Sequence, residues 1–147
     1  MTEYISSETN VTVITNATTI FRCLESKPKI TLISTGGILR RDSQHLVGPS
    51  AENSLQDMRV DKLFLEVSGV SYDFGLSHTD ISEVTIQQAM IRSAREVILL
   101  ADHTKFEQES FIQIAPIETV DKLITDSGLP AQNRLRFNAA GIEVIVC

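Results

Sequence analysis

Short, almost continuously apolar runs recur along the chain, and they constrain its fold more than any other feature. Each run is of strand length and is bounded by polar or turn-forming residues. The runs are Val11–Thr15, Ile30–Ser34, Leu63–Val67, Val97–Ala101, Leu123–Thr125 and Ile142–Val146. Strands that are apolar throughout, rather than at alternate positions, are typical of parallel sheets that are covered on both faces. We therefore expect a mainly parallel sheet whose strands are buried on both sides.

Helical patterns fit between these runs. The strongest spans Asp80–Ala94, where Asp80 or Ser82 can cap the first turn. Its apolar stripe is predicted to consist of Ile81, Val84, Met90, Ile91 and Ala94. Three further helices are expected at Ala17–Glu25, Pro49–Met58 and Pro130–Ala139, the last ending before Gly141. Alternating strands and helices predict an α/β, Rossmann-like fold with helices flanking the sheet.

Length and charge exclude several classes of function. A chain of 147 residues fits one domain, and its net charge of −6 argues against direct binding of a nucleic-acid backbone. The two cysteines, Cys23 and Cys147, form no metal-binding or disulfide pattern. Neither a membrane-spanning run nor a secretory signal is recognisable, so we expect a cytoplasmic protein without membrane contact.

Polar residues follow the first two predicted strands, at the sheet edge where α/β proteins bind ligands. Thr15 and Asn16 precede a predicted helix and could offer hydrogen bonds to an anion. Thr35 is followed by Gly36 and Gly37, which would allow a ligand to approach the backbone. The alternatives are a simple helix cap at the first position and a tight turn at the second.

Two later strand ends carry charged or small residues. Small and polar side chains gather around Gly69 and over Gly75–Asp80, and Asp102 and Lys105 follow the next strand. Lys105 could place a positive charge against an anionic ligand, or it could simply pair with Asp102. A metal site at His78 and its neighbouring aspartates is disfavoured, because too few ligands are present.

Several common catalytic and cofactor motifs are absent from the sequence. It contains no G-x-S-x-G, no G-x-G-x-x-G and no G-x-x-x-x-G-K-[ST]. Dinucleotides and nucleoside triphosphates are therefore poor candidates as ligands, and we expect no cofactor and no metal.

Taken together, segments along nearly the whole chain resemble the C-terminal effector-binding domain of DeoR-type bacterial repressors of sugar metabolism. In particular, the sequence ADHTKF (101–106) resembles that family's aspartate–serine–serine–lysine–phenylalanine motif. The matching segments are Val11–Ala17, Thr31–Arg40, Leu46–Asn53, Asp61–Leu65, Gly69–Leu76, Met90–Phe106, Val120–Gly128 and Gly141–Val146.

The resemblance implies a fold shared with ribose-5-phosphate isomerase, glucosamine-6-phosphate deaminase and CoA transferases. It further implies a phosphorylated sugar or related metabolite as effector, and self-association as a dimer or tetramer. Residues 1–147 would form one effector-binding domain, and DNA would be contacted only through a winged helix-turn-helix that this sequence does not contain.

Two departures from the family pattern stand out. The family's first strand, with its glycine–threonine–threonine phosphate loop, is missing, and Met1–Ser7 resembles the tail of the helix after that loop. We expect the loss of this strand to expose a sheet edge or apolar surface that other copies of the chain cover. Gln87 occupies a position where many members have lysine, so it contributes a hydrogen-bond donor but no charge.

Three functions remain open on these grounds. A sugar isomerase or deaminase needs a general base, but the strand end at Val67–Val70 has no acid, and the amide of Gln87 cannot serve as one. We therefore expect a sensor rather than an enzyme. A structural remnant that only oligomerises is the third reading.

We expect ligand contacts from residues at these strand ends and on the helix after His78. Lys105 would meet an anion, Asp80 and Glu83 would accept sugar hydroxyls, and the glycines would allow close approach of the backbone. The full predicted set is Thr15, Asn16, Thr35, Gly36, Gly37, Gly69, Gly75, Ser77, Asp80, Glu83, Gln87, Asp102 and Lys105.

Overall fold

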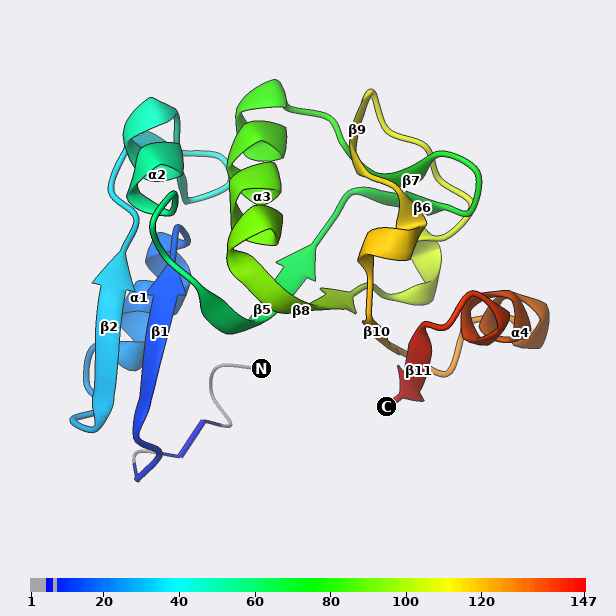
Figure 1. The fold of residues 1–147 in the computed structure, drawn as a ribbon, viewed down its shortest axis with the longest axis horizontal. Coiled ribbons are helices and arrows are strands. Elements are labelled where there is room, and N and C mark those ends of the chain that lie inside the picture. The colour runs from blue at the N-terminus through cyan, green and yellow to red at the C-terminus, as the bar shows by residue number, and fades with distance from the viewer. Residues whose placement is uncertain (1–4, 7) are drawn as a thin grey trace. The chain divides into compact units, whose positions relative to one another are not determined.

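The computed structural model describes residues 5–6 and 8–147, and the chain divides into two compact units, residues 1–56 and 57–147 (Figure 1). Each unit has its own parallel strands. The hypothesis that Met1–Ser7 is the tail of a helix lies outside the described residues at positions 1–4 and 7.

The first unit is built on a parallel pair of strands. β1 (Val11–Thr15) pairs with β2 (Ile30–Ser34) along its whole length, and α1 (Thr18–Leu24) connects them. A short antiparallel pair follows, β3 (Ile38–Arg40) with β4 (His45–Val47). The chain then enters α2 (Pro49–Ser54), which has Pro49 in its first turn and ends four residues earlier than predicted.

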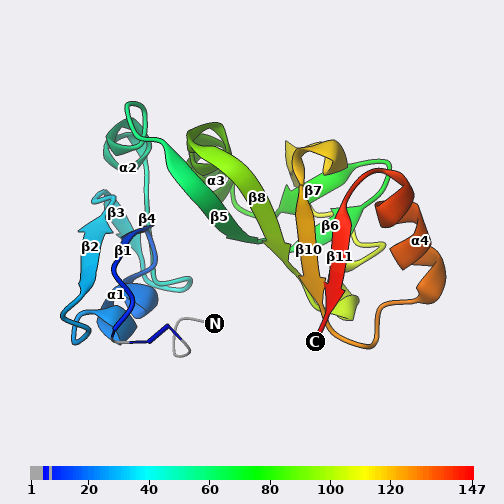
Figure 2. The same ribbon diagram turned by 60° about the horizontal axis from the view of Figure 1, so that its bottom comes forward.

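The second unit contains the main sheet. It has the strand order β11–β10–β8–β5, and every neighbouring pair is parallel (Figure 2). Its strands are β5 (Val60–Glu66), β8 (Ala94–Leu100), β10 (Lys122–Thr125) and β11 (Glu143–Val146). All four were predicted as apolar runs, and the mainly parallel α/β class is confirmed. β5 has β8 as its only paired strand among the described residues.

A second, antiparallel sheet lies in the same unit and was not predicted. β6 (Gly69–Ser71), β7 (Gly75–His78) and β9 (Ile112–Ala115) pair in the order β6–β7–β9. The sequence indicated only small and polar loop residues here, and that interpretation was wrong. Val70 and Leu76 are fully buried, and the strands are too short to show an apolar pattern.

Two longer helices follow the predicted positions closely. α3 (Ile81–Ser93) is capped by Asp80, whose side chain accepts a hydrogen bond from Ser82 N at 2.8 Å. α4 (Ala131–Ala139) is followed by Gly141, whose φ of +84° is the left-handed conformation expected after a helix. Short 3-10 turns, η2 (His103–Lys105) and η3 (Ile117–Thr119), complete the unit.

The core of the second unit lies on one face of the main sheet. Leu65, Leu99, Leu123 and Val144 form one row across its four strands, and they pack with Val84, Phe137 and the antiparallel sheet. The next row, Glu66–Leu100–Ile124–Ile145, belongs to the opposite face.

Two sequence expectations about burial were wrong. The strands are not buried on both faces: Phe64 in β5 is 42% exposed, and most of β11 is exposed. Ile81 was assigned to the apolar stripe of α3 but is 63% exposed, whereas Glu83 and Gln87 on the same helix are buried. The inward face of α3 carries Glu83, Val84 and Gln87 instead of Ile81, because packing against the rest of the unit decides which face is buried.

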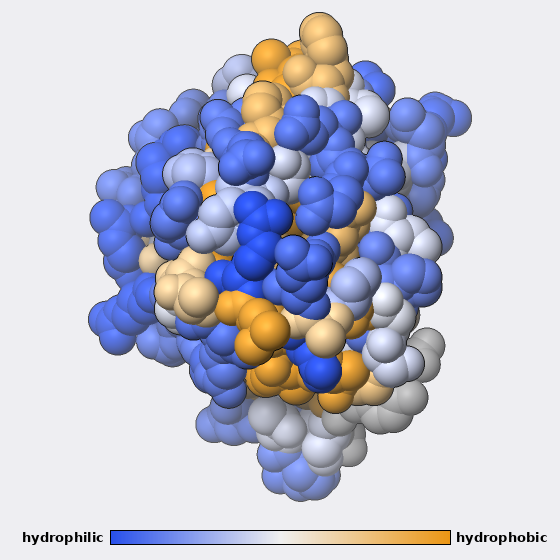
Figure 3. Space-filling view, turned by 90° about the vertical axis from the view of Figure 1, so that its right-hand side faces the viewer, coloured by the Kyte–Doolittle hydropathy of each residue, from blue (hydrophilic) through white to orange (hydrophobic). Residues whose placement is uncertain are grey.

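The surface of the second unit retains large apolar side chains. Phe111 and Leu135 are mostly exposed, and Ile145 and Val146 are partly so. On the face drawn in Figure 3, hydrophobic side chains gather among hydrophilic ones. No helix in the described part of the chain is long and apolar enough to span a membrane.

Candidate functional site

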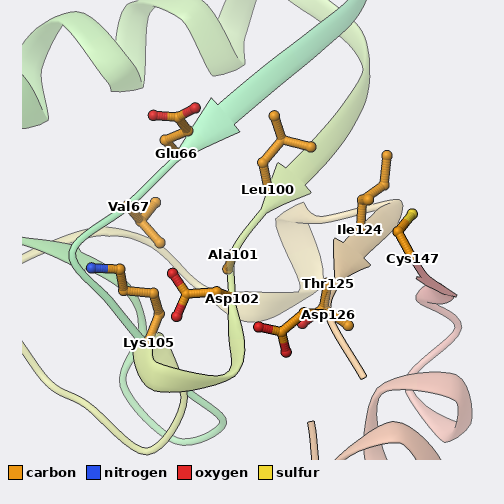
Figure 4. A pocket seen from close by; sticks show the side chains of 10 residues that line it. All are labelled: Glu66, Val67, Leu100, Ala101, Asp102, Lys105, Ile124, Thr125, Asp126 and Cys147. Carbon is orange, nitrogen blue, oxygen red and sulfur yellow. The ribbon is translucent and has the colours of Figure 1, made fainter. Parts of the chain in front are cut away.

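A hollow of about 540 Å³ lies at the carboxyl ends of the four parallel strands (Figure 4). This edge of a parallel sheet is where α/β proteins place their ligands, because loops and free backbone groups converge there. The lining residues come from the ends of all four strands and the loops that follow them. They are Glu66, Val67, Leu100, Ala101, Asp102, Lys105, Ile124, Thr125, Asp126 and Cys147.

The loop after β8 contributes Asp102 and Lys105, two of the predicted residues. Asp102 caps η2 by accepting hydrogen bonds from Thr104 N, at 2.8 Å, and from the Thr104 hydroxyl. The Thr104 hydroxyl lowers the pKa of the Asp102 carboxyl below its ordinary value, and the nearby charge of Lys105 adds to this effect.

Lys105 is half-buried, and its ammonium makes no hydrogen bond or ion pair within the described part of the chain. A direct pair with Asp102, the alternative that the sequence left open, does not form. The ammonium is therefore a free donor at the wall of the hollow, and in Figure 4 it extends past the Asp102 carboxylate.

The loop after β10 contributes Asp126, which joins the two loops at the hollow. Its Oδ2 lies 2.9 Å from the ring Nδ1 of His103, and its Oδ1 accepts hydrogen bonds from His103 N and Gly128 N at 3.3 and 3.0 Å. The hydrogen bond between the two side chains raises the pKa of His103 and lowers that of Asp126. We call Asp126, His103 and Gly128 the loop clip.

Asp102, His103 and Asp126 also place possible metal-ligating atoms within 4.8 Å of one another. Their atoms are already engaged, since His103 Nδ1 bonds Asp126 and Asp102 Oδ1 bonds Thr104. A metal ion would have to compete with these hydrogen bonds, and all three residues retain solvent access. The geometry is explained without a metal.

A buried hydroxyl adds an unused polar group to the lining. Thr125 is 4% exposed, and its Oγ1 has no hydrogen-bond partner among the described residues. Buried polar atoms without partners are uncommon, because losing water without replacement costs free energy. Thr125 Oγ1 can donate or accept a hydrogen bond when a ligand or water is present.

Gln87 reaches the same strand end from α3. Its Nε2 donates to the backbone oxygen of Glu66 at 2.9 Å, while its Oε1 is buried without a partner among the described residues. Glu83 lies one turn earlier on the helix and is 3% exposed. Asp80 acts as the helix cap, so its predicted contact with a sugar hydroxyl would have to compete with that role.

The three predicted residues in the antiparallel sheet have clear packing roles. A side chain at Gly69 would collide with the backbone of Gln108, and one at Gly75 with that of Ala115. Ser77 is fully buried, and its hydroxyl donates to Gly69 O and accepts from Ser110 N. These contacts explain the small residues without invoking a ligand.

The predicted residues of the first unit gather at the carboxyl ends of β1 and β2. Thr35 N donates to Thr15 O at 3.2 Å, and Thr15 Oγ1 accepts from Ala17 N at 3.0 Å. Asn16 Nδ2 donates to Leu46 O at 3.3 Å. Gly36 and Gly37 both have positive φ, and a side chain at Gly37 would meet Val47 O at 2.6 Å.

Sequence reasoning placed Asp102 and Lys105 in the hollow but missed Glu66, Thr125 and Asp126. Thr125 and Asp126 sit at the end of a strand that was predicted, so the same strand-end rule could have found them. Glu66 is the last residue of β5, but it lies inside the apolar run Leu63–Val67 from which the strand was predicted, so the sequence did not mark it as a strand-end residue.

Known proteins resemble the chain over most of its length. The family model described as the DeoR C terminal sensor domain matches residues 1–127. The HTH-type transcriptional repressor GlcR of Bacillus subtilis is 36% identical over 136 residues, which cover 92% of this chain and 52% of the relative.

Two further regulators extend the comparison. The HTH-type transcriptional regulator GlpR of Haloferax volcanii is 37% identical over 76% of this chain and 44% of its own length. The glycerol-3-phosphate regulon repressor of Escherichia coli is 29% identical over 96% of this chain and 56% of its own length. The chain thus spans about half the length of the curated relatives that it matches.

Proposed function

The chain belongs to the DeoR C-terminal sensor domain family, and from this premise we propose that it senses a phosphorylated sugar for a transcriptional regulator of sugar metabolism. Binding would occur without turnover of the ligand. Residues 1–147 would act as one sensor domain in the cytoplasm. DNA would be contacted by a helix-turn-helix outside this sequence, and copies of the domain would self-associate.

The observation that carries the proposal is the hollow at the carboxyl edge of the main sheet, whose wall contains the ammonium of Lys105 with no partner among the described residues. An ammonium in a half-buried wall can meet an anionic group on a ligand. Asp102 and Asp126 supply acceptors for hydroxyl groups, as sugars require. Their hydrogen bonds to Thr104 and His103 hold both carboxylates in place.

The position of Gln87 on α3 supports binding without turnover. A sugar isomerase needs a group that can take and return a proton near neutral pH. Gln87 is an amide, and its donor side is already bonded to Glu66 O. The other residues predicted from sequence remain candidates for ligand contact, Thr15, Asn16, Thr35, Gly36 and Gly37 in the first unit among them.

Such a sensor works when its ligand binds two states of the regulator with different affinities. A ligand shifts a conformational or oligomeric equilibrium only through its different affinity for the two states. The exposed Phe111 and Leu135 support self-association, because apolar surface of this kind is often covered by another copy.

Thermal unfolding against a panel of sugar phosphates and the corresponding free sugars tests the proposal. A ligand at about 100 times its Kd adds about 2.7 kcal/mol to stability, which raises the midpoint of a domain this size by several degrees. We expect a rise with a phosphorylated sugar that is lost in Lys105→Ala and retained in the control Lys29→Ala. Conversion of an aldose to a ketose that disappears in Glu83→Gln would contradict the absence of turnover.

A further inference from the structure

The charges around the hollow do not balance. Its wall contains three carboxylates, Glu66, Asp102 and Asp126, and one ammonium, Lys105. His103 lies outside the lining and offsets Asp126 when it is protonated. Even then the carboxylates exceed the cations, so the hollow has a negative potential at neutral pH.

A phosphate group fits such a wall poorly. Phosphate and carboxylate oxygens both accept hydrogen bonds and neither donates, so they repel each other when they share a site. Lys105 is the one lining side chain that is both cationic and free to donate. A phosphate could therefore be held at Lys105, but not among the carboxylates.

The carboxylates instead suit a group rich in donors. Glu66 makes no side-chain hydrogen bond or ion pair among the described residues, and Asp102 keeps Oδ2 free while Oδ1 bonds Thr104. Hydroxyl and ammonium groups both donate to carboxylates, and a charged donor forms the stronger bond.

An independent feature points to a bound ligand in the same place. Thr125 belongs to the lining and is only 4% exposed, and its hydroxyl oxygen has no partner among the described residues. A donor-rich ligand would satisfy it, as would one with a free acceptor. The hollow thus combines excess acceptors with an unsatisfied polar atom, which is the complement of a polyhydroxylated cation.

We propose that the hollow binds the hydroxyl-rich, amine-bearing part of its effector, so that the ligand is an amino-sugar phosphate with its ammonium among Glu66, Asp102 and Asp126. This inference rests on the proposed function for its phosphate, which would lie toward Lys105. The amine part of the inference does not depend on the proposed function, because it rests on the carboxylates of the hollow.

Matched ligand pairs provide the test. Glucosamine 6-phosphate, glucose 6-phosphate and N-acetylglucosamine 6-phosphate differ only in the group at C2, which is an ammonium, a hydroxyl and an acetamide. The corresponding galactose series differs in the same way. By isothermal titration calorimetry at about pH 6.5, where an amine is protonated, we expect the amino form to bind at least about tenfold more tightly than either other form.

Two variants of the lining and one control locate the preference. Glu66→Gln removes one exposed negative charge from the hollow and should reduce the amine preference severalfold, whereas Glu118→Gln, an exposed acid outside the lining, should leave it unchanged. A preference that survives both Glu66→Gln and Asp102→Asn would place the ammonium elsewhere and overturn the inference.

The remaining outcomes separate the two proposals. Equal affinity for amino and hydroxyl forms would overturn the inference and leave the proposed function standing. Binding of unphosphorylated glucosamine or galactosamine that is lost in Glu66→Gln and does not depend on phosphate would support the amine site. It would overturn the proposed function and, with it, the phosphate part of the inference. No binding of any of these compounds would overturn the inference, and the wider panel of sugar phosphates would then decide the proposed function.

Discussion

The Asp126 carboxylate lies 2.9 Å from the ring Nδ1 of His103 and also accepts the backbone N–H of His103 at 3.3 Å. One side chain after β10 thereby holds the loop after β8 in place. The same carboxylate accepts the N–H of Gly128, against which the His103 ring packs closely. The position of Asp102 and Lys105 at the hollow therefore depends on a residue more than twenty positions further along the chain.

The loop clip should make stability depend on pH. Because the pair raises the pKa of His103, this side chain stabilises the fold fully below pH 6.5, the ordinary pKa of histidine. That stabilisation is lost as the pH rises through the raised pKa. Because the pair lowers the pKa of Asp126, this side chain stabilises the fold fully above pH 3.8, the ordinary pKa of aspartate. That stabilisation is lost as the pH falls through the lowered pKa. The difference in free energy of unfolding between wild type and His103→Gln should therefore be largest between these two pH limits.

Urea unfolding across pH measures this difference directly. The advantage of wild type over His103→Gln should shrink steadily above neutral pH, because the imidazole loses its charge. His78→Gln is the control, since His78 accepts a hydrogen bond from Asp80 N instead of pairing with an acid. An advantage of constant size between pH 6 and pH 9 would contradict the role of the ion pair.

Gly75 and Gly141 should respond differently to the same substitution. Both have φ near +85°, where alanine is strained by about 1–2 kcal/mol. A Cβ at Gly75 would also collide with the backbone of Ala115, whereas no atom of the described residues lies within 4 Å of a Cβ at Gly141. Gly75→Ala should cost about 3 kcal/mol or more, and Gly141→Ala only the backbone strain. Equal losses in denaturant unfolding would show that β7 and β9 are less tightly packed than described.

Leu123 should be essential to the core of the second unit. It is 1% exposed and lies between Leu99 and Val144 in the row across the main sheet. Leu123→Ala should lower the free energy of unfolding by about 2–5 kcal/mol, through lost burial and the cavity left behind. Leu135→Ala, on the 70% exposed side chain in α4, should change it by about 0.5 kcal/mol or less.

Asp80 should stabilise α3 through its cap. Removing the acceptor in Asp80→Ala leaves Ser82 N without its bond and should cost about 1 kcal/mol. Asp80→Ser retains an acceptor at the same position and should recover most of the loss. Urea unfolding of the two variants distinguishes a hydrogen-bonding cap from an effect of charge alone. Serine has no charge, so an equal loss of stability in Asp80→Ser and Asp80→Ala would contradict the role of the cap.

Local sequence predicted the parallel strands well. β1 and β2 match their apolar runs residue for residue, and β5, β8, β10 and β11 lie within a few residues of theirs. These runs are long enough, and rich enough in β-branched residues, for intrinsic preference to agree with the final fold. The cap at Asp80 and the left-handed Gly141 were equally visible, because both depend on near neighbours.

The antiparallel sheet was not visible for the opposite reason. Gly69–Ser71 and Gly75–His78 contain small and polar residues whose strand conformation depends on pairing with each other and with β9. β9 begins more than thirty positions after β7 ends, so no local window contains the pairing. Burial of Glu83 and Gln87 on α3 was hidden in the same way, since only packing decides which helix face turns inward.

The sequence by itself determined the α/β class, the order of strands and helices, and the family, because these depend on local periodicity and on motifs read in order along the chain. It also placed Asp102 and Lys105 at the carboxyl edge of the sheet, where the hollow lies. Only the tertiary structure decided that Glu66 and Asp126 join them and that His103 pairs with Asp126. It also decided that the Lys105 ammonium has no partner within the part of the chain that the structure describes. Charge balance in a hollow depends on which strand ends meet across a sheet, and that depends on long-range pairing.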